Sequence, residues 1–162
     1  MALTLNPLTE ADISACCALD TRVSDYPWAE STFRRGLQSN HWARVALSDE
    51  QLVGFCICLL VADELSILNI AVDQAWQRQG VGQTLLSAAL EAGRTHGATE
   101  AFLEVRQSNA GAQALYASNG FHIAGIREDY YPARKPMPAA PDSARPRPGR
   151  EHALIMARTL LA

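Results

Sequence analysis

The stretch "VDQAWQRQGVGQTLL", Val72–Leu86, sets the architecture of this chain. An apolar run precedes it and apolar residues at helical spacing follow it, which predicts a strand, a glycine-rich loop and then a helix. The first-turn amides of a helix have no partner within the helix and lie at its positive end, so they can bind an anion with several oxygens. Gly80 and Gly82 leave room for a pyrophosphate, and Arg78 adds a positive charge. The alternative interpretation is a glycine-rich turn into a helix that binds nothing.

Two common nucleotide-binding motifs do not fit this loop. No Gly-Lys-Ser/Thr follows the glycines, so the loop is not a P-loop, and Leu85 stands where a dinucleotide-binding loop has its third glycine. The loop by itself therefore predicts an anion site without identifying the anion.

The composition is that of an ordinary soluble globular protein, with 162 residues of which 48% are hydrophobic and 19% charged. This length suits one domain. No apolar run is long enough to cross a bilayer, and the N-terminus lacks the features of a signal peptide, so we expect a cytoplasmic protein. The histidines and cysteines fall at no metal-ligand spacing. We therefore expect no metal, and reduced, mostly buried thiols at Cys16, Cys17, Cys56 and Cys58.

Charge and proline are unevenly distributed along the chain. Residues 132–150 hold five basic residues and one acidic residue, a net charge of +4, so the remainder carries −7 of the total of −3. An acidic body suits a basic substrate, and we expect no direct nucleic-acid binding. Six of the eight prolines lie in residues 131–150, which predicts a long loop between two strands.

Hydrophobic periodicity predicts a mixed α/β (α+β) fold. Short links between the runs that end at Leu47, Val61 and Val72 predict an antiparallel meander. The predicted strands are Leu3–Leu8, Trp42–Leu47, Leu52–Val61, Leu65–Val72, Ala101–Val105, Phe121–Tyr130 and Ala153–Leu160. The predicted helices run from Thr9 to about Arg22, from Ala29 to about Gln38, from Val81 to a cap at Gly97, and from Ser108 or Asn109 to Asn119-Gly120.

The loop "QRQGVG", Gln77–Gly82, resembles the Q/R-x-x-G-x-G/A loop of the GCN5-related N-acetyltransferases (GNAT), which grips the pyrophosphate of acetyl-CoA. The preceding "LNIAV" is similar to the central strand of that family, whose backbone pairs with the pantetheine arm. The resemblance implies a single domain over residues 1–162, with a mostly antiparallel sheet of about seven strands and acetyl-CoA between splayed central strands. The cofactor-binding residues it implies are Ile70, Ala71, Val72, Arg78, Gln79, Gly80, Val81, Gly82, Gln83 and Asn109.

Further motifs resemble the RimI branch of this superfamily, which acetylates the N-terminal alanine of a small-subunit ribosomal protein. The longest is "LEVRQSNAGAQALYASNGF", Leu103–Phe121, and the shorter ones are "DYPWAES", "DELSILNIAVD", "REDYYP" and "GREHALIMA". The resemblance implies a protein N-terminus as the acceptor. It also marks residues 133–148 as an insertion, which is either a tolerated loop or a contact site for a partner.

Acetyl transfer to an amine requires a base, an oxyanion donor and an acid for the departing thiolate. An α-amino group has a pKa of about 7.7–8, so a modest base is sufficient. Glu104 is the candidate base by resemblance, although a lone carboxylate in an apolar strand is also expected simply to face solvent. Tyr116 is the candidate acid, and its alternative role is a core aromatic. A backbone amide near Val72 is a plausible oxyanion donor.

Three more side-chain groups have two interpretations each. Asn109 is expected to cap a helix, a role compatible with binding the cofactor. Tyr130-Tyr131 and Trp28 either line the acceptor side or pack as ordinary aromatics.

We expect direct transfer in a ternary complex, because neither Cys56 nor Cys58 has a histidine neighbour in sequence that would favour an acyl-enzyme. Two rival functions stay open. One is an acetyltransferase for small-molecule amines, and the other is a non-catalytic acetyl-CoA-binding module.

Overall fold

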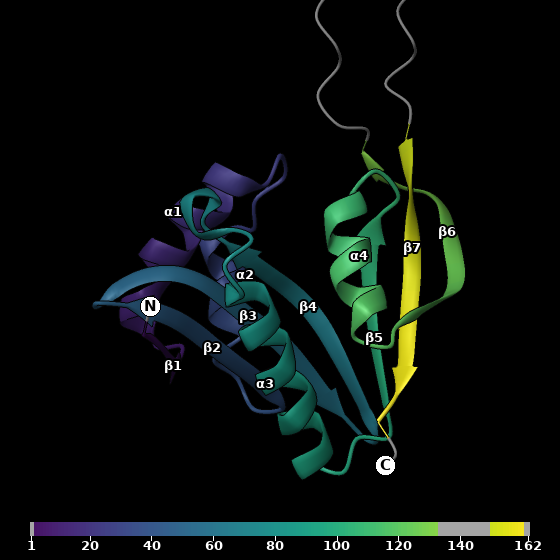
Figure 1. The fold of residues 1–162 in the computed structure, drawn as a ribbon, viewed down its shortest axis with the longest axis horizontal. Helices are drawn as coiled ribbons and strands as arrows, with labels where there is room; N and C mark the ends of the chain where they lie inside the picture. The colour runs from purple at the N-terminus through teal and green to yellow at the C-terminus, as the bar shows by residue number, and fades with distance from the viewer. Residues whose placement is uncertain (1, 133–149, 161–162) are drawn as a thin grey trace, which may run out of the picture. The chain divides into compact units, whose positions relative to one another are not determined.

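The computed structural model describes residues 2–132 and 150–160, so the predicted insertion at 133–148 lies outside the described residues. Seven strands form a sheet in the hydrogen-bonded order β1-β2-β3-β4-β5-β7-β6 (Figure 1). The strands are β1 Leu3–Pro7, β2 His41–Ser48, β3 Gln51–Val61, β4 Glu64–Val72, β5 Glu100–Arg106, β6 His122–Pro132 and β7 Arg150–Thr159. The helices are α1 Ile13–Val23, α2 Glu30–Arg35, α3 Val81–Thr95 and α4 Ala110–Ser118, with 3-10 turns η1 Glu10–Asp12 and η2 Gln74–Trp76.

The chain divides into two compact units, which are described separately. Unit 1 is Met1–Phe102 with Thr159–Ala162, and unit 2 is Leu103–Arg158. In unit 1 the pairs β1–β2, β2–β3 and β3–β4 are all antiparallel, which confirms the predicted meander. The β3–β4 ladder is irregular, because Ile57 pairs with Asn69 while Cys58 pairs with Ile67. Leu68 is the extra residue and is 42% exposed.

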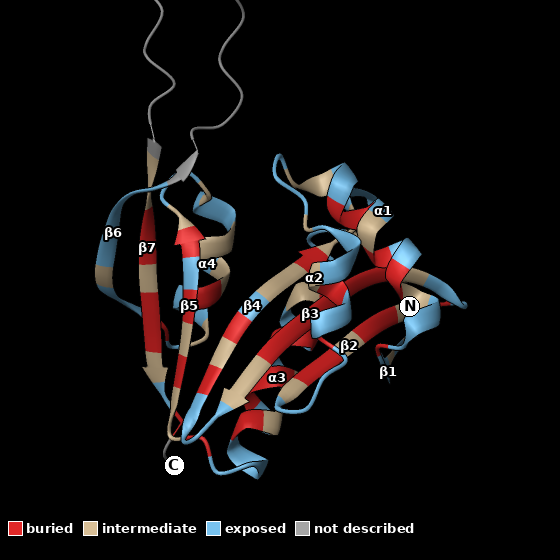
Figure 2. Ribbon diagram, turned by 180° about the vertical axis from the view of Figure 1, so that it is seen from behind, coloured by how far each residue is buried: buried red, intermediate tan, exposed pale blue. Residues whose placement is uncertain are grey.

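Strand β3 is buried along most of its length because helices cover both of its faces (Figure 2). Phe55 and Ile57 belong to a core cluster with residues of α1 and α2, including Leu19 and Phe33. On the opposite face, a Cβ atom added to Gly54 would lie 3.1 Å from Val81 and 3.2 Å from Leu85 of α3. Glycine at this position therefore allows α3 to pack closely on the sheet.

All four cysteines are free thiols, and three of them are buried, as the sequence predicted. Cys56 and Cys58 share one face of β3, with their Sγ atoms 3.7 Å apart. None of the helices within residues 2–132 and 150–160 is both long and apolar enough to span a membrane.

Some predicted boundaries are wrong by a few residues. The helix predicted from Thr9 begins as the 3-10 turn η1 and becomes α-helical only at Ile13. In η1 the Asp12 carboxylate accepts the backbone N–H of Thr9 at 2.8 Å and the hydroxyl of Thr9 at 3.1 Å. Helix α2 ends at Arg35, earlier than predicted, because the next amides turn to i−3 carbonyls, Gly36 to Phe33 among them. Strand β7 begins at Arg150 because its polar start pairs with the end of β6.

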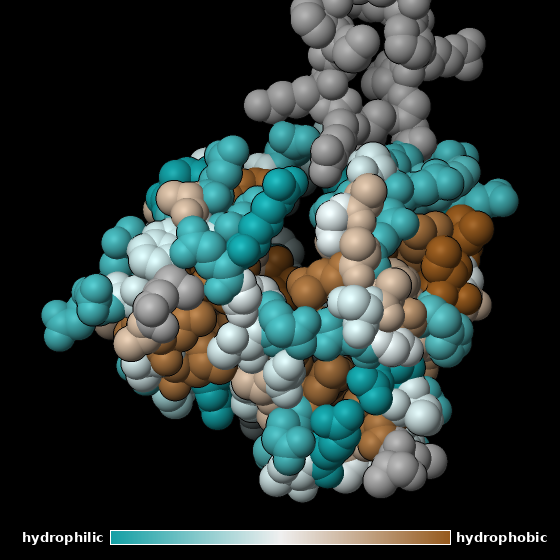
Figure 3. All heavy atoms as spheres, in the orientation of Figure 1, coloured by the Kyte–Doolittle hydropathy of each residue, from teal (hydrophilic) through white to brown (hydrophobic). Residues whose placement is uncertain are grey.

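In unit 2, β6 pairs with β7 and lies at the edge of the sheet. The register between them shifts twice, and Asp129, inside the second irregularity, has a left-handed φ of 51°. Apolar surface gathers over β6, where Ile123 is 56% and Ile126 55% exposed (Figure 3). Irregular pairing at an edge strand interrupts the regular row of backbone groups that another strand could join.

Candidate active site

The loop before α3 adopts backbone conformations that only certain residues tolerate well. Gly80 has φ 86° and stands at the N-cap position, while Arg78 has φ 62°. The first helical hydrogen bond runs from the amide of Thr84 to the carbonyl of Gly80 at 2.9 Å. The amides of Val81 and Gly82 precede it, and helix geometry gives such amides no intrahelical partner. The predicted strand–loop–helix arrangement is thus present, with an N-terminus that has no capping side chain.

Polar side chains hold the approach to this loop in place. The η2 turn begins after Asp73, whose carboxylate accepts the amide of Ala75 at 3.3 Å. The side-chain amide of Gln77 donates to the carbonyl of Val72 at 3.1 Å, and that of Gln79 donates to the carbonyl of Ala75 at 3.1 Å. Gln77 and Gln79 therefore order the loop backbone through their own side chains.

The predicted pantetheine-binding residues end β4 immediately before this loop. Ile70, Ala71 and Val72 pair with Cys56, Phe55 and Gly54 of β3. Ala71 is buried in the core cluster, so this end of the strand is anchored from one face. Nine of the ten predicted cofactor residues, all except Asn109, therefore lie between the end of β4 and the first turn of α3.

In unit 2, the predicted base Glu104 projects from β5 between the buried residues Leu103 and Val105. Its Oε1 lies 3.3 Å from Nε of Arg127 in β6, and the two side chains are 31% and 50% exposed. The Arg127 guanidinium also stacks on Tyr130, with Cζ 4.8 Å from the ring centroid. Arg127 thus joins the candidate base to one of the aromatics predicted to line the acceptor side. No local sequence pattern distinguishes this arginine from an ordinary surface charge.

Asn109 occupies the N-cap of α4, as predicted. Its side-chain oxygen accepts the amide of Ala112 at 3.1 Å, and its carbonyl accepts the amide of Gln113 at 3.1 Å. The side chain of Gln113 donates back to the carbonyls of Arg106 at 3.1 Å and Gln107 at 2.8 Å. This helix start satisfies part of its own hydrogen-bonding capacity with side chains.

Tyr116 lies on α4 and is 6% exposed. Its ring meets Phe121 edge-on at a centroid distance of 5.9 Å, so the core-aromatic interpretation describes its packing. Trp28 is also packed, with its ring 5.3 Å from that of Phe33.

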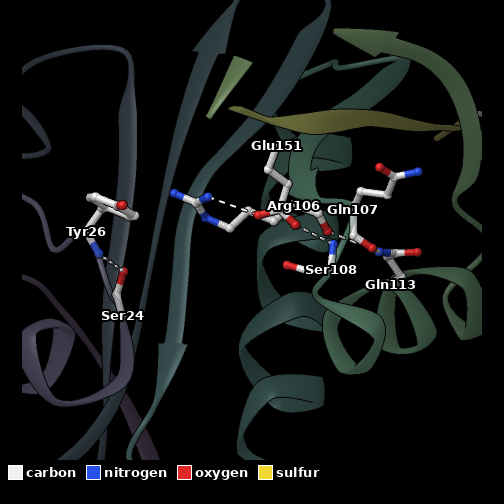
Figure 4. A network of polar contacts seen from close by, with 7 residues as sticks. All are labelled: Ser24, Tyr26, Arg106, Gln107, Ser108, Gln113 and Glu151. Atoms are coloured by element: carbon white, nitrogen blue, oxygen red, sulfur yellow. Dashed lines mark hydrogen bonds and ion pairs between the residues drawn. The ribbon is translucent and has the colours of Figure 1, made fainter. Parts of the chain in front are cut away.

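A carboxylate that sequence analysis missed organises the turn between β5 and α4 (Figure 4). Glu151 accepts the amide of Ser108 at 2.7 Å and Nη1 of Arg106 at 3.1 Å. Burial raises the pKa of Glu151, but the hydrogen bonds from Ser108 and Arg106 and the positive charge of Arg106 outweigh it, so the net pKa is lowered. Glu151 stands in "GREHALIMA" beside two other polar residues, and no local pattern distinguishes it from a solvent-facing charge.

No three His, Cys, Asp or Glu side chains lie together as a metal site within the described residues. The arrangement offers an open helix N-terminus after a strand in unit 1, and a carboxylate–arginine–tyrosine row with a capped helix in unit 2.

Residues 11–121 match the acetyltransferase (GNAT) family, and the chain belongs to this family. It is therefore an acyltransferase that takes its acetyl group from acetyl-CoA.

Within the family, the chain is similar to the [ribosomal protein bS18]-alanine N-acetyltransferases. It is 37% identical to that of Salmonella typhimurium over 155 residues, which are 95% of each chain. It is 36% identical to that of Escherichia coli K12 over 154 residues, again 95% of each.

Two solved structures have the same fold as this chain. The ribosomal-protein-S18-alanine N-acetyltransferase from Escherichia coli gives a TM-score of 0.86 at 34% identity, covering 99% of this chain and 96% of that one. Ard1 from Thermoplasma volcanium gives a TM-score of 0.80 at 23% identity over the whole of both chains, and shares the fold.

Proposed function

We propose that this chain transfers acetyl from acetyl-CoA to the α-amino group of an N-terminal alanine, in a small-subunit ribosomal protein of the bS18 kind. The observation that carries the proposal is the similarity to bS18-alanine N-acetyltransferases over 95% of both chains. Such an acceptor would be met in the cytoplasm. The acidic balance outside residues 132–150 suits a basic acceptor.

In the proposed reaction, most of the groups that bind the cofactor belong to unit 1. The amides at the start of α3 and the Arg78 side chain bind the pyrophosphate, and the backbone of Ile70–Val72 binds the pantetheine arm, with Asn109 of unit 2 as a further ligand. The left-handed conformation of Gly80 supports pyrophosphate binding, because it leads the loop directly into a helix whose N-terminus has no capping side chain.

The candidate catalytic side chains belong to unit 2. Glu104 removes a proton from the acceptor ammonium, directly or through a water, and the amine nitrogen attacks the thioester carbonyl carbon. A backbone amide near Val72 stabilises the oxyanion. The carbon–sulfur bond then breaks, and Tyr116 gives its proton to the thiolate, whose conjugate thiol has a pKa of about 8.5 against about 10 for a phenol. The nitrogen loses its second proton to become the amide, and this proton restores the Tyr116 phenol. No acyl-enzyme forms.

Substitution of the two side chains tests this assignment. Glu104→Gln and Tyr116→Phe should each lower kcat for an Ala-Arg-starting peptide by about 10²–10⁴-fold at neutral pH. Glu100→Gln is the matched control, because Glu100 is a carboxylate of the same strand and accepts a hydrogen bond from the hydroxyl of Thr159. Full kcat in both test variants would refute the assignment.

A panel of acceptors tests the reaction class. Peptides that vary the first residue should show a preference for alanine, measured as kcat/KM from thiol release. Higher kcat/KM with spermidine or an aminoglycoside would identify a small-molecule acetyltransferase. No thiol release with any amine, together with acetyl-CoA binding in a titration, would identify a non-catalytic module.

A further inference from the structure

Unit 1 contains a buried carboxylate that the proposed chemistry does not use. Asp20, in α1, is 3% exposed. Its Oδ2 accepts the backbone amide of Trp28 at 2.9 Å and the side-chain amide of Asn69 at 3.4 Å. Burial raises the pKa of this carboxyl, and the two hydrogen bonds offset part of that rise. A carboxylate removed from water persists only where its partners compensate for the lost hydration.

The two partners of Asp20 come from different parts of unit 1. Trp28 lies between α1 and α2, and Asn69 lies in β4, directly before Ile70 and directly after the extra residue Leu68. One carboxylate therefore fixes a helix, the segment that follows it and the strand that leads to the cofactor loop.

A second contact from α1 reaches the other end of the same stretch of β4. Nη2 of Arg22 lies 2.9 Å from Oδ2 of Asp73, the residue that follows Val72. Asp20 and Arg22 thus bracket Ile70–Val72, the stretch assigned to the pantetheine arm. Asp20 is the buried member of the pair, while the Arg22 side chain is 54% exposed.

The segment Ser24–Ala29 is held at its ends and exposed in the middle. The Trp28 ring packs against Phe33, and the amide of Tyr26 donates to Oγ of Ser24 at 3.2 Å (Figure 4). Between these anchors Asp25, Tyr26 and Pro27 are exposed, Tyr26 by 45%. A carboxylate and an aromatic ring on a short, anchored segment suit a basic peptide.

We infer that Asp20 is a positioning residue for the acceptor, because it holds Ser24–Ala29 in fixed register with Ile70–Val72. This inference rests on the proposed function. It adds that acceptor recognition is tied to the cofactor-binding strand through one buried carboxylate of α1, which itself touches neither substrate.

The test separates the KM values of the two substrates. In Asp20→Ala the segment loses its backbone anchor, so KM for an Ala-Arg-starting peptide should rise by about tenfold to a hundredfold. KM for acetyl-CoA should stay within about twofold, because the α3 loop is unchanged.

Asp12→Ala is the matched control. Asp12 also accepts two hydrogen bonds, at the opposite end of the same helix, and both come from Thr9. Its loss should lower stability and leave the peptide KM unchanged. An unchanged peptide KM in Asp20→Ala, or an equal rise in Asp12→Ala, would overturn the inference.

A conservative variant distinguishes positioning from direct charge contact. In Asp20→Asn the side-chain oxygen can still accept both the Trp28 amide and the Asn69 side-chain amide, because both bonds go to one oxygen of Asp20. Asp20→Asn should therefore restore most of the peptide KM. If it is as impaired as Asp20→Ala, the negative charge itself meets the acceptor and Asp20 is not a positioning residue.

Hydrogen exchange gives a readout that needs no activity. Amide exchange across Ser24–Ala29 should accelerate in Asp20→Ala and stay near wild type in Asp20→Asn and Asp12→Ala. Unchanged exchange in Asp20→Ala would refute the anchor even in an active enzyme. Accelerated exchange in a chain that acetylates no peptide would refute the proposed function and leave the anchor standing.

Discussion

Helix α3 follows a strand and a loop that contains the η2 turn, and helix α4 follows a strand and a short turn, but the two helices begin in different ways. Helix α3 begins at Gly80, which is left-handed and has no side chain with which to cap it. Helix α4 begins at Asn109, whose side chain accepts the amide of Ala112, and Gln113 ties its first turn back to the preceding strand. The N-terminus of α3 has no capping side chain, whereas that of α4 satisfies part of its hydrogen-bonding capacity with side chains.

The difference shows how the polar groups of the two units are used. In unit 1 the groups proposed to bind the cofactor are mainly backbone atoms, which glycine exposes and no side chain competes for. In unit 2 side chains dominate, with Glu104 on Arg127 and Glu151 on Arg106 and the Ser108 amide.

The same substitution in the two first turns should have opposite effects on stability. Gln113→Glu replaces a donor to two carbonyls with an acceptor, and should lower the free energy of unfolding by about 2 kcal/mol. Gln83→Glu places a negative charge at the uncapped N-terminus of α3, and should raise the free energy of unfolding by about 0.3–1 kcal/mol. Denaturant unfolding of both variants measures the difference.

The charge added by Gln83→Glu should also weaken cofactor binding. Gln83→Glu should raise KM for acetyl-CoA about fivefold, because the new carboxylate repels the pyrophosphate. Ser87→Asp, one turn further along α3, adds the same charge away from the helix end and is the control. Equal KM values for the two variants would argue against an anion at the α3 N-terminus.

Removal of the cap should affect α4 alone. Asn109→Ala should cost about 1 kcal/mol of stability, whereas Asn109→Asp keeps an acceptor for the Ala112 amide and should cost much less. Thermal unfolding of the two variants gives the comparison. If both raise KM for acetyl-CoA equally while only one loses stability, Asn109 binds the cofactor independently of its capping role.

Gly80→Ala should separate backbone strain from cofactor binding. Gly80 and Gly97 have φ of 86° and 85°, and a Cβ at either would meet no atom within 4 Å. Alanine should therefore cost about 1 kcal/mol at each site through strain alone. Only Gly80→Ala should also raise KM for acetyl-CoA, by several-fold. A similar rise in Gly97→Ala would mean that the loop has no special role.

The smallest expected effect is the pH dependence contributed by Glu151. Its pKa is lowered in the folded protein, so the stabilisation it gives is present above the unfolded pKa of about 4.3 and is lost as pH falls through the folded pKa. Near neutral pH the free energy of unfolding of the wild type should exceed that of Glu151→Gln by under about 1 kcal/mol. The two free energies should converge in acid. A difference in the free energy of unfolding that widens below pH 4 would contradict this pH dependence.

Local patterns predicted most of the elements because they act over a few residues. The glycine at 97 ends α3, and Asn119-Gly120 ends α4 with the amide of Phe121 bonded to the carbonyl of Tyr116, as expected from capping chemistry. The boundaries that failed, at α2 and β7, depend on packing and strand pairing that lie outside a local window.

The sequence by itself determined the strand–loop–helix around Gly80, the meander and the Asn109 cap, since each follows from apolar runs, short links or capping residues that are consecutive in the chain. Tertiary structure alone decided the partners that carboxylates found far along the chain. Asp20 and Asn69 are 49 positions apart, Arg106 and Glu151 are 45 apart, and Arg127 reaches Glu104 from another strand. Such pairs depend on the register and packing of whole elements, and a charged residue in a sequence carries no local mark of the partner it will meet.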